Sequence, residues 1–119
     1  MKLLKNIQNK RDLVALGLDK RKAEEILHRI KILSEDDSDK FEAIKKAYSE
    51  VLRLGYLSKE ETFELISHGV NIPKTIFEAT EVLEAQVLAD IELRKLDSSD
   101  VEYVIRYLTP QVEMLKIKK

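Results

Sequence analysis

The residues best suited to acid–base or metal chemistry are few. The chain has two histidines, His28 and His68, and no cysteine, so thiol nucleophiles, disulfides and thiolate metal sites are absent. Glu25 and His28 have the Glu-x-x-His spacing of helical di-iron sites, but such a site needs a second pair, and no Glu lies three residues before His68. We therefore expect no metal site, and we interpret His28 as a surface residue beside a helix-stabilising Glu.

The acidic run 36–39 could suggest calcium binding. A calcium-binding EF-hand loop needs alternating oxygen ligands, Gly at its sixth position and Glu at its twelfth. Counted from Asp37, the fifth position is Phe41 and the sixth is Glu42. We therefore interpret the run as a solvated loop before a capped helix.

Catalytic and cofactor motifs are missing as well. Gly17, Gly55 and Gly69 are isolated from one another, so they cannot form a glycine-rich phosphate loop, and each stands where a helix should end. No serine has the context of a nucleophile elbow. The 22 acidic residues contain no pair that the sequence singles out for catalysis. We expect neither catalytic residues nor a cofactor, and the chain is not predicted to be an enzyme.

Composition predicts an all-α fold in a single domain that spans 1–119. The 119 residues are 44% hydrophobic and 36% charged, with only three Gly and two Pro. This mixture is rich in helix formers and poor in helix breakers, and its length suits one core. We expect a compact bundle of about six or seven helices, in which 9–33 forms a helix-turn-helix-like corner and 39–119 forms the body.

The helix signals give approximate bounds along the chain. Apolar spacing and capping patterns predict helices over 10–16, 20–33, about 39–54, about 58–68, about 72–96, from Ser99 (with Glu102) and from Thr109–Pro110. The fifth of these would be one long central helix, and its apolar residues cover a wide arc. A helix of that kind is central in its fold or shared between subunits, so a homodimer through the long helix is expected.

Charge divides the chain into a basic first part and an acidic middle. Residues 1–33 carry a net charge of +5, residues 34–100 carry −8 and residues 101–119 carry +2. This asymmetry suggests two surfaces with different partners, and the alternative is ordinary scatter in a highly charged chain.

Residues 9–29 carry the one segment with a functional pattern. Leu16, Gly17 and Leu18 give apolar, Gly, apolar across a turn, and Ala23 and Ile26 are spaced to pack the second helix on the first. The segment resembles the helix-turn-helix of small prokaryotic and phage DNA-binding proteins. The alternative is a purely structural corner.

The resemblance implies that the second helix enters the major groove of DNA. The residues that it places toward DNA are Lys20, Arg21, Lys22, His28, Arg29 and Lys31. Glu24 and Glu25 would share the groove-facing side and repel phosphates unless one of them accepts a hydrogen bond from a cytosine amino group. Asp12 and Leu13 also depart from the motif, which usually has an apolar residue and Ala at these positions. A similar outline over 63–77 lies in acidic surroundings, and we interpret it as structural.

The function expected from these patterns is non-catalytic binding. The first hypothesis is a small DNA-binding or transcription-regulatory accessory protein of phage or mobile-element type. The alternative is a protein–protein interaction module, an adaptor or inhibitor without nucleic-acid binding. Its candidate anchors, since Tyr is enriched in binding hot spots, are Tyr48, Tyr56, Tyr103 and Tyr107.

No segment predicts a membrane protein. The basic start at residues 1–5 is followed by no apolar run, so it does not predict a signal peptide. No stretch approaches the roughly 18 apolar residues of a membrane span. We expect a cytoplasmic protein.

Overall fold

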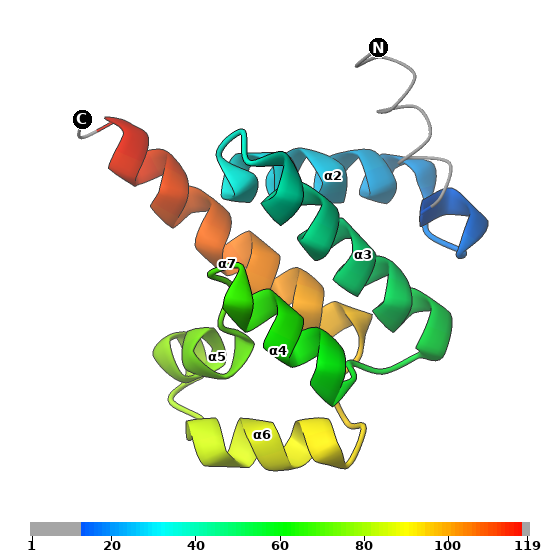
Figure 1. Ribbon diagram of the computed structural model, residues 1–119, viewed down its shortest axis with the longest axis vertical. Coiled ribbons are helices and arrows are strands. Elements are labelled where there is room, and N and C mark those ends of the chain that lie inside the picture. The colour runs from blue at the N-terminus through cyan, green and yellow to red at the C-terminus, as the bar shows by residue number, and fades with distance from the viewer. Residues whose placement is uncertain (1–12, 118–119) are drawn as a thin grey trace.

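The chain folds into α-helices, and no strand occurs among the residues described by the computed structural model, which are 13–117 (Figure 1). A helical turn at 13–15 leads into Gly17. The helices that follow are α2 (Lys20–Ser34), α3 (Ser38–Leu54), α4 (Lys59–Ser67), α5 (Ile72–Thr80), α6 (Glu84–Glu92) and α7 (Ser98–Ile117). The predicted all-α bundle is confirmed. Residues 10–12 of the first predicted helix lie outside the described range.

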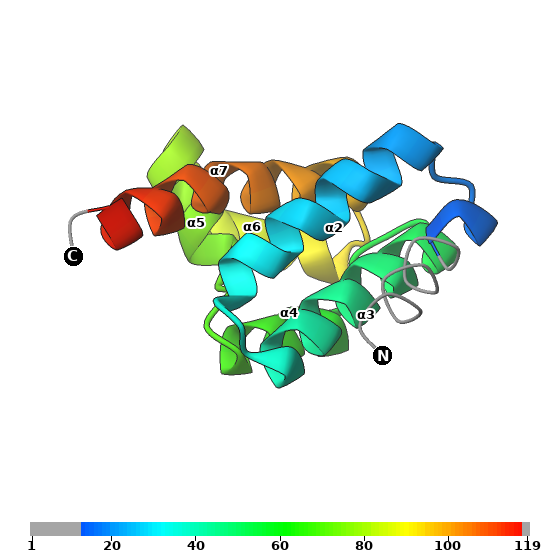
Figure 2. The same ribbon diagram turned by 90° about the horizontal axis from the view of Figure 1, so that it is seen from above.

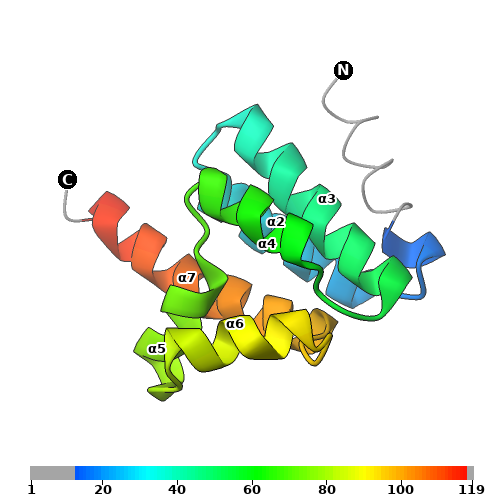
Figure 3. The ribbon, with the colours of Figure 1, turned by 60° about the horizontal axis from the view of Figure 1, so that its bottom comes forward.

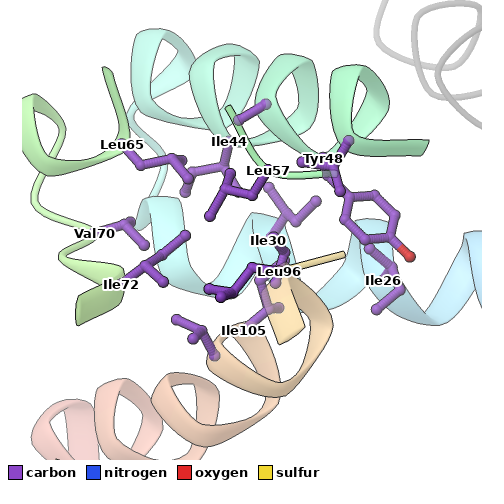
Figure 4. Packing of buried hydrophobic residues seen from close by; sticks show 14 of the residues in the cluster. Ile26, Ile30, Ile44, Tyr48, Leu57, Leu65, Val70, Ile72, Leu96 and Ile105 are labelled. Atoms are coloured by element: carbon purple, nitrogen blue, oxygen red, sulfur yellow. The ribbon is translucent and has the colours of Figure 1, made fainter. Parts of the chain in front are cut away.

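Helix α2 lies between α3 and α7, and it packs against both (Figure 2). Helix α4 packs on α3, while α5 packs on α6 and α7. The core fills the space between these helices with aliphatic side chains and Tyr48 (Figure 4). Because α2 contributes one side to this core, its opposite side is left toward solvent.

The helix starts follow side-chain capping, partly as predicted. Ser58 caps α4, because its Oγ accepts a hydrogen bond from the backbone N–H of Glu61 at 3.1 Å. The predicted box of Ser99 and Glu102 at the start of α7 is wrong. Asp97 accepts from the N–H of Ser99 at 2.9 Å, and Asp100 accepts from the N–H of Asp97 at 2.9 Å. Glu102 is thereby left available for another role.

The predicted long central helix over 72–96 is wrong, because the chain breaks between α5 and α6. Glu81 has a left-handed backbone conformation with φ of 65°, and its N–H donates to the carbonyl of Phe77. Figure 1 shows α6 running across the bottom of the molecule, while α5 is seen nearly end-on. The turn lets Val87 and Ile91 reach the core, where they are nearly fully buried. Neither Gly nor Pro marks this break, so no local sequence signal predicts it.

The break also removes the basis for a dimer formed through one long helix. The apolar residues over 72–96 are divided between two shorter helices. Helix α5 buries Ile72, Pro73 and Thr75, and α6 buries Val87 and Ile91. The predicted restart at Thr109–Pro110 is likewise absent, since α7 continues through Pro110. The Thr109 hydroxyl donates to the carbonyl of Ile105 at 2.6 Å, within the helix.

Candidate nucleic-acid interface

The corner before α2 is built on Gly17. Its φ is 98°, a region that L-residues rarely adopt, and it ends the preceding turn. The N–H of Leu18 donates to the carbonyl of Leu13 at 3.2 Å, and the N–H of Gly17 donates to that of Val14 at 3.0 Å. This pair of bonds is the Schellman arrangement, and it redirects the chain into α2. The predicted helix end at Gly17 is confirmed.

Helix α2 is held in place by one apolar stripe. Ala23, Ile26 and Ile30 are fully buried, and Leu33 is nearly so. Their spacing of three and four residues places them on one side, toward α3 and α7. The positions that the sequence singled out for close packing, Ala23 and Ile26, therefore lie in the core.

The opposite side of α2 is cationic. Most of the side chains that the helix-turn-helix resemblance places toward DNA are exposed, and Arg29 is partly so. Within residues 13–117, no ion pair holds four of them: Lys20, Arg21, His28 and Lys31. We call these four residues the free cationic face, because Lys20, Arg21 and Lys31 are cations and none of the four has an ion-pair partner among the described residues. Arg21 and His28 are two turns apart, so they lie on the same line along the helix.

Lys22 and Arg29 differ from the other four because they pair with carboxylates of the protein itself. Lys22 Nζ lies 3.0 Å from an oxygen of Glu102, and Arg29 Nε lies 3.4 Å from Glu25. Arg106 joins the two pairs, at 2.8 Å from Glu102 and 2.6 Å from Glu25. These five residues form the α2–α7 ion-pair network. The hydrogen bond that Arg106 donates to the Glu102 carboxylate is the main cause of the raised pKa of Arg106.

The α2–α7 ion-pair network compensates the charge of one of the two carboxylates that would repel DNA phosphates. Glu25 is neutralised by Arg106, which lies across on α7. Glu24 remains on the exposed side, one turn from Lys20 and one turn from His28. Of the two carboxylates, Glu24 is therefore the one that lies nearer to the free cationic face.

Glu102 and Arg106 are residues of the α2–α7 ion-pair network that sequence reasoning missed. They lie far along the chain from α2, and only their own i,i+4 spacing is visible in the sequence. Glu102 is 8% exposed, which is unusual for a carboxylate. Its burial follows from the packing of α7 on α2, which periodicity does not encode.

A buried tyrosine lies beside the network. Tyr48 on α3 is 1% exposed, and its hydroxyl has no hydrogen-bond partner among the described residues. In Figure 4 this hydroxyl points toward α2 beside Ile26. Burial, with a contribution from the Glu102 carboxylate, raises the pKa of Tyr48 to about 12. Tyr48 is thus a core residue, whereas Tyr103 is exposed and Tyr56 and Tyr107 are half-buried.

The second corner, within 63–77, has the same backbone geometry. Gly69 has φ of 87°, and the N–H of Val70 donates to the carbonyl of Leu65 at 2.8 Å. Thr75 is buried, and its hydroxyl is satisfied by the carbonyl of Asn71 at 2.7 Å. Helix α5, which follows this corner, carries Lys74 as its single cation. Charge, not backbone shape, therefore distinguishes the corner at Gly17 from the corner at Gly69.

The described residues offer no alternative metal site or membrane segment. No group of three or more His, Asp or Glu side chains in 13–117 is arranged to hold a metal ion. Over the same range, no helix is both long enough and apolar enough to cross a bilayer.

Comparisons with known proteins leave the family open. No protein-family model matches the chain, and the searches of curated proteins and of solved structures gave no match. The function proposed below therefore rests on the chain's own residues.

Proposed function

We propose that this protein binds duplex DNA, with α2 as the helix that enters the major groove, and that it acts as a small regulatory or accessory protein. The observation that carries the proposal is the free cationic face. Its four side chains project from a helix whose other side is anchored in the core. A rigid helix with exposed cations can neutralise phosphates and place side chains against base edges.

The two ends of the face would have different tasks. Lys20 and Arg21 lie in the first turn of α2, and the N-terminal part of a recognition helix contacts base edges in this class of protein. Arg is well suited to guanine, because its guanidinium can donate to both O6 and N7. Lys31 lies in the last turn and would reach a phosphate.

Charge reversal in the first turn tests the proposal. We expect Lys20→Glu with Arg21→Glu to weaken binding to a random duplex of about 20 base pairs by roughly 100-fold at about 50 mM salt. Acidic residues are favoured near a helix N-terminus, so the variant should keep its thermal stability. Fluorescence anisotropy measures the affinity, and circular dichroism measures the melting temperature. Lys22 is left unchanged because it pairs with Glu102.

The matched control reverses two exposed cations elsewhere. Lys74→Glu with Lys95→Glu changes the net charge by the same amount, on α5 and just after α6. We expect this variant to bind DNA nearly as well as the unmodified protein. Equal losses in the two double variants would show a nonspecific charge effect and would contradict the proposal, as would binding that survives the change in α2.

A further inference from the structure

The lobe formed by α4, α5 and α6 has a second surface with its own chemistry. Residues 59–92, which span the three helices, contain eight carboxylates and two Lys, which gives a net charge of −6. Figure 3 brings this lobe forward, with α4 above α6 in the view. Such a surface repels DNA and attracts cationic partners.

Large apolar side chains are exposed on the same lobe. Phe63 on α4 is 54% exposed and Leu88 on α6 is 42% exposed. Further exposed apolar side chains belong to the same lobe: Phe77, Val82, Leu83 and Leu93. Exposed apolar residues that gather on one lobe, instead of lying singly, are typical of an interaction surface.

Phe63 and Leu88 line one pocket between α4 and α6. The pocket has a volume of about 160 Å³, and its other walls are formed by Lys59, Thr62, Ile91 and Glu92. An apolar cavity of roughly 150 Å³ holds a molecule the size of benzene. The pocket therefore has room for one large apolar side chain.

Helical spacing places carboxylates within one turn of Phe63 and Leu88, and we call these carboxylates the acidic rim. Glu60 lies three residues before Phe63, and Glu84 and Glu92 lie one turn before and one turn after Leu88. Lys59 pairs with Glu92 at 3.3 Å, and both side chains are mostly exposed. An exposed pair of this kind is weak and can rearrange when a partner brings a stronger cation.

We propose that the pocket between α4 and α6 is a docking site for a basic amphipathic helix of another protein. One Leu, Met or Phe of that helix would enter between Phe63 and Leu88. Lys or Arg residues three and four positions away would then face Glu60 and Glu84. The acidic rim selects against an anionic membrane surface, and it lies on a different set of helices from the free cationic face. Docking here would let a DNA-bound protein hold a second protein.

A synthetic helix tests this site in the full-length chain. The probe is a labelled peptide of about 18 residues, with Leu at helical spacing on one side and Lys on the other. Anisotropy at about 0.15 M salt limits long-range charge effects. We expect Phe63→Ala with Leu88→Ala to weaken binding roughly tenfold or more, since the two side chains form the walls of the anchor pocket. Both are partly exposed, and a melting curve confirms that the variant is folded.

A matched variant and a second peptide sharpen the test. Tyr103→Ala with Met114→Ala also removes one aromatic and one aliphatic side chain that are exposed, but both lie on α7. We expect this variant to keep its affinity, and we expect a peptide with Glu in place of Lys not to bind. Equal weakening in both double variants, or tight binding of the acidic peptide, would overturn the proposal. A dimer of the unmodified chain in light scattering that Phe63→Ala with Leu88→Ala dissociates would make the occupant a second copy, and it would also overturn the proposal.

Discussion

Tyr48 brings together two unfavourable features at the scale of a single residue. Its hydroxyl is buried without a hydrogen-bond partner among the described residues, and it lies near the carboxylate of Glu102. Removing a polar group from water without replacing its hydrogen bond costs about 1–3 kcal/mol. The same environment disfavours the tyrosinate, because a buried negative charge would face another negative charge.

We expect Tyr48→Phe to stabilise the protein by about 1 kcal/mol at neutral pH, because it removes the unsatisfied hydroxyl and keeps the ring. The pKa of Tyr48 in the folded state is about 12, against 10.0 for an ordinary tyrosine. The unfolded chain therefore loses this proton first, so stability is lost as pH rises from about 10 to about 12. Denaturant melts at several pH values measure this loss. It should be smaller in Tyr48→Phe than in Tyr103→Phe, and equal losses would contradict the assignment.

Glu102 is the residue on which the α2–α7 ion-pair network depends. It pairs with both Lys22 and Arg106 while it is nearly buried. We expect Glu102→Gln to lower the free energy of unfolding by about 1–2 kcal/mol, because hydrogen bonds to a charged acceptor are replaced by neutral ones. It should also strengthen DNA binding, because Lys22 is released. Glu113→Gln, at an exposed position of α7, serves as the control in chemical denaturation. If the network does not contribute to stability, both variants will show the same small change in the free energy of unfolding.

The exposed cations of α2 could be predicted from the sequence, but their pairing could not. Helical spacing alone places Arg21 and His28 opposite Ala23 and Ile26. The separation of Lys22 from the free cationic face depends on Glu102, which a tertiary contact brings near. Such contacts depend on the angle and position at which two helices cross, and these cannot be predicted from a single sequence.

At the scale of elements, the helix boundaries at Gly17 and Ser58 were predictable, whereas the break at Glu81 was not. Gly17 and Ser58 have the conformations or bonds that their residue types favour. Glu81 adopts a left-handed conformation without the residue type that usually marks one. The gain from burying Val87 and Ile91 outweighs the local preference of 72–96 for one continuous helix.

Glycine substitution distinguishes two helices from one. In the middle of a continuous helix, Glu81→Gly would cost about 1 kcal/mol, whereas at a left-handed position Gly removes strain. We expect Glu81→Gly to be neutral or stabilising in thermal melts. Glu78→Gly, inside α5, should be destabilising by about 1 kcal/mol. Similar destabilisation by both substitutions would contradict the break at Glu81 and support a single long helix.

At the scale of the whole molecule, charge is separated along the fold. Helix α2, with the free cationic face, lies toward the top of Figure 1, and α6 with much of the acidic lobe lies at the bottom. The sequence predicted this separation from the basic net charge of 1–33 and the acidic net charge of 34–100. It did not predict the pocket at Phe63 and Leu88, because that pocket requires α6 to be a separate helix.

This separation predicts a salt-dependent influence of the acidic lobe on DNA binding. The triple variant Glu78→Gln, Glu81→Gln and Glu84→Gln removes three exposed carboxylates. We expect it to strengthen DNA binding at about 10 mM salt, where charges act over roughly 30 Å, and to leave binding unchanged at about 150 mM, where they act over about 8 Å. Anisotropy titrations at the two salt concentrations measure the difference. An effect that persists at the higher salt would place the lobe in direct contact with DNA.

The most direct test of the central claim is an NMR titration of the isotope-labelled chain with duplex DNA at low salt. If α2 enters the groove, the largest shifts of backbone amide signals will lie between Gly17 and Lys31, with smaller changes on α7 near Arg106. Shifts centred on α4–α6, or no shifts at DNA concentrations that saturate ordinary nonspecific binders, would contradict the account.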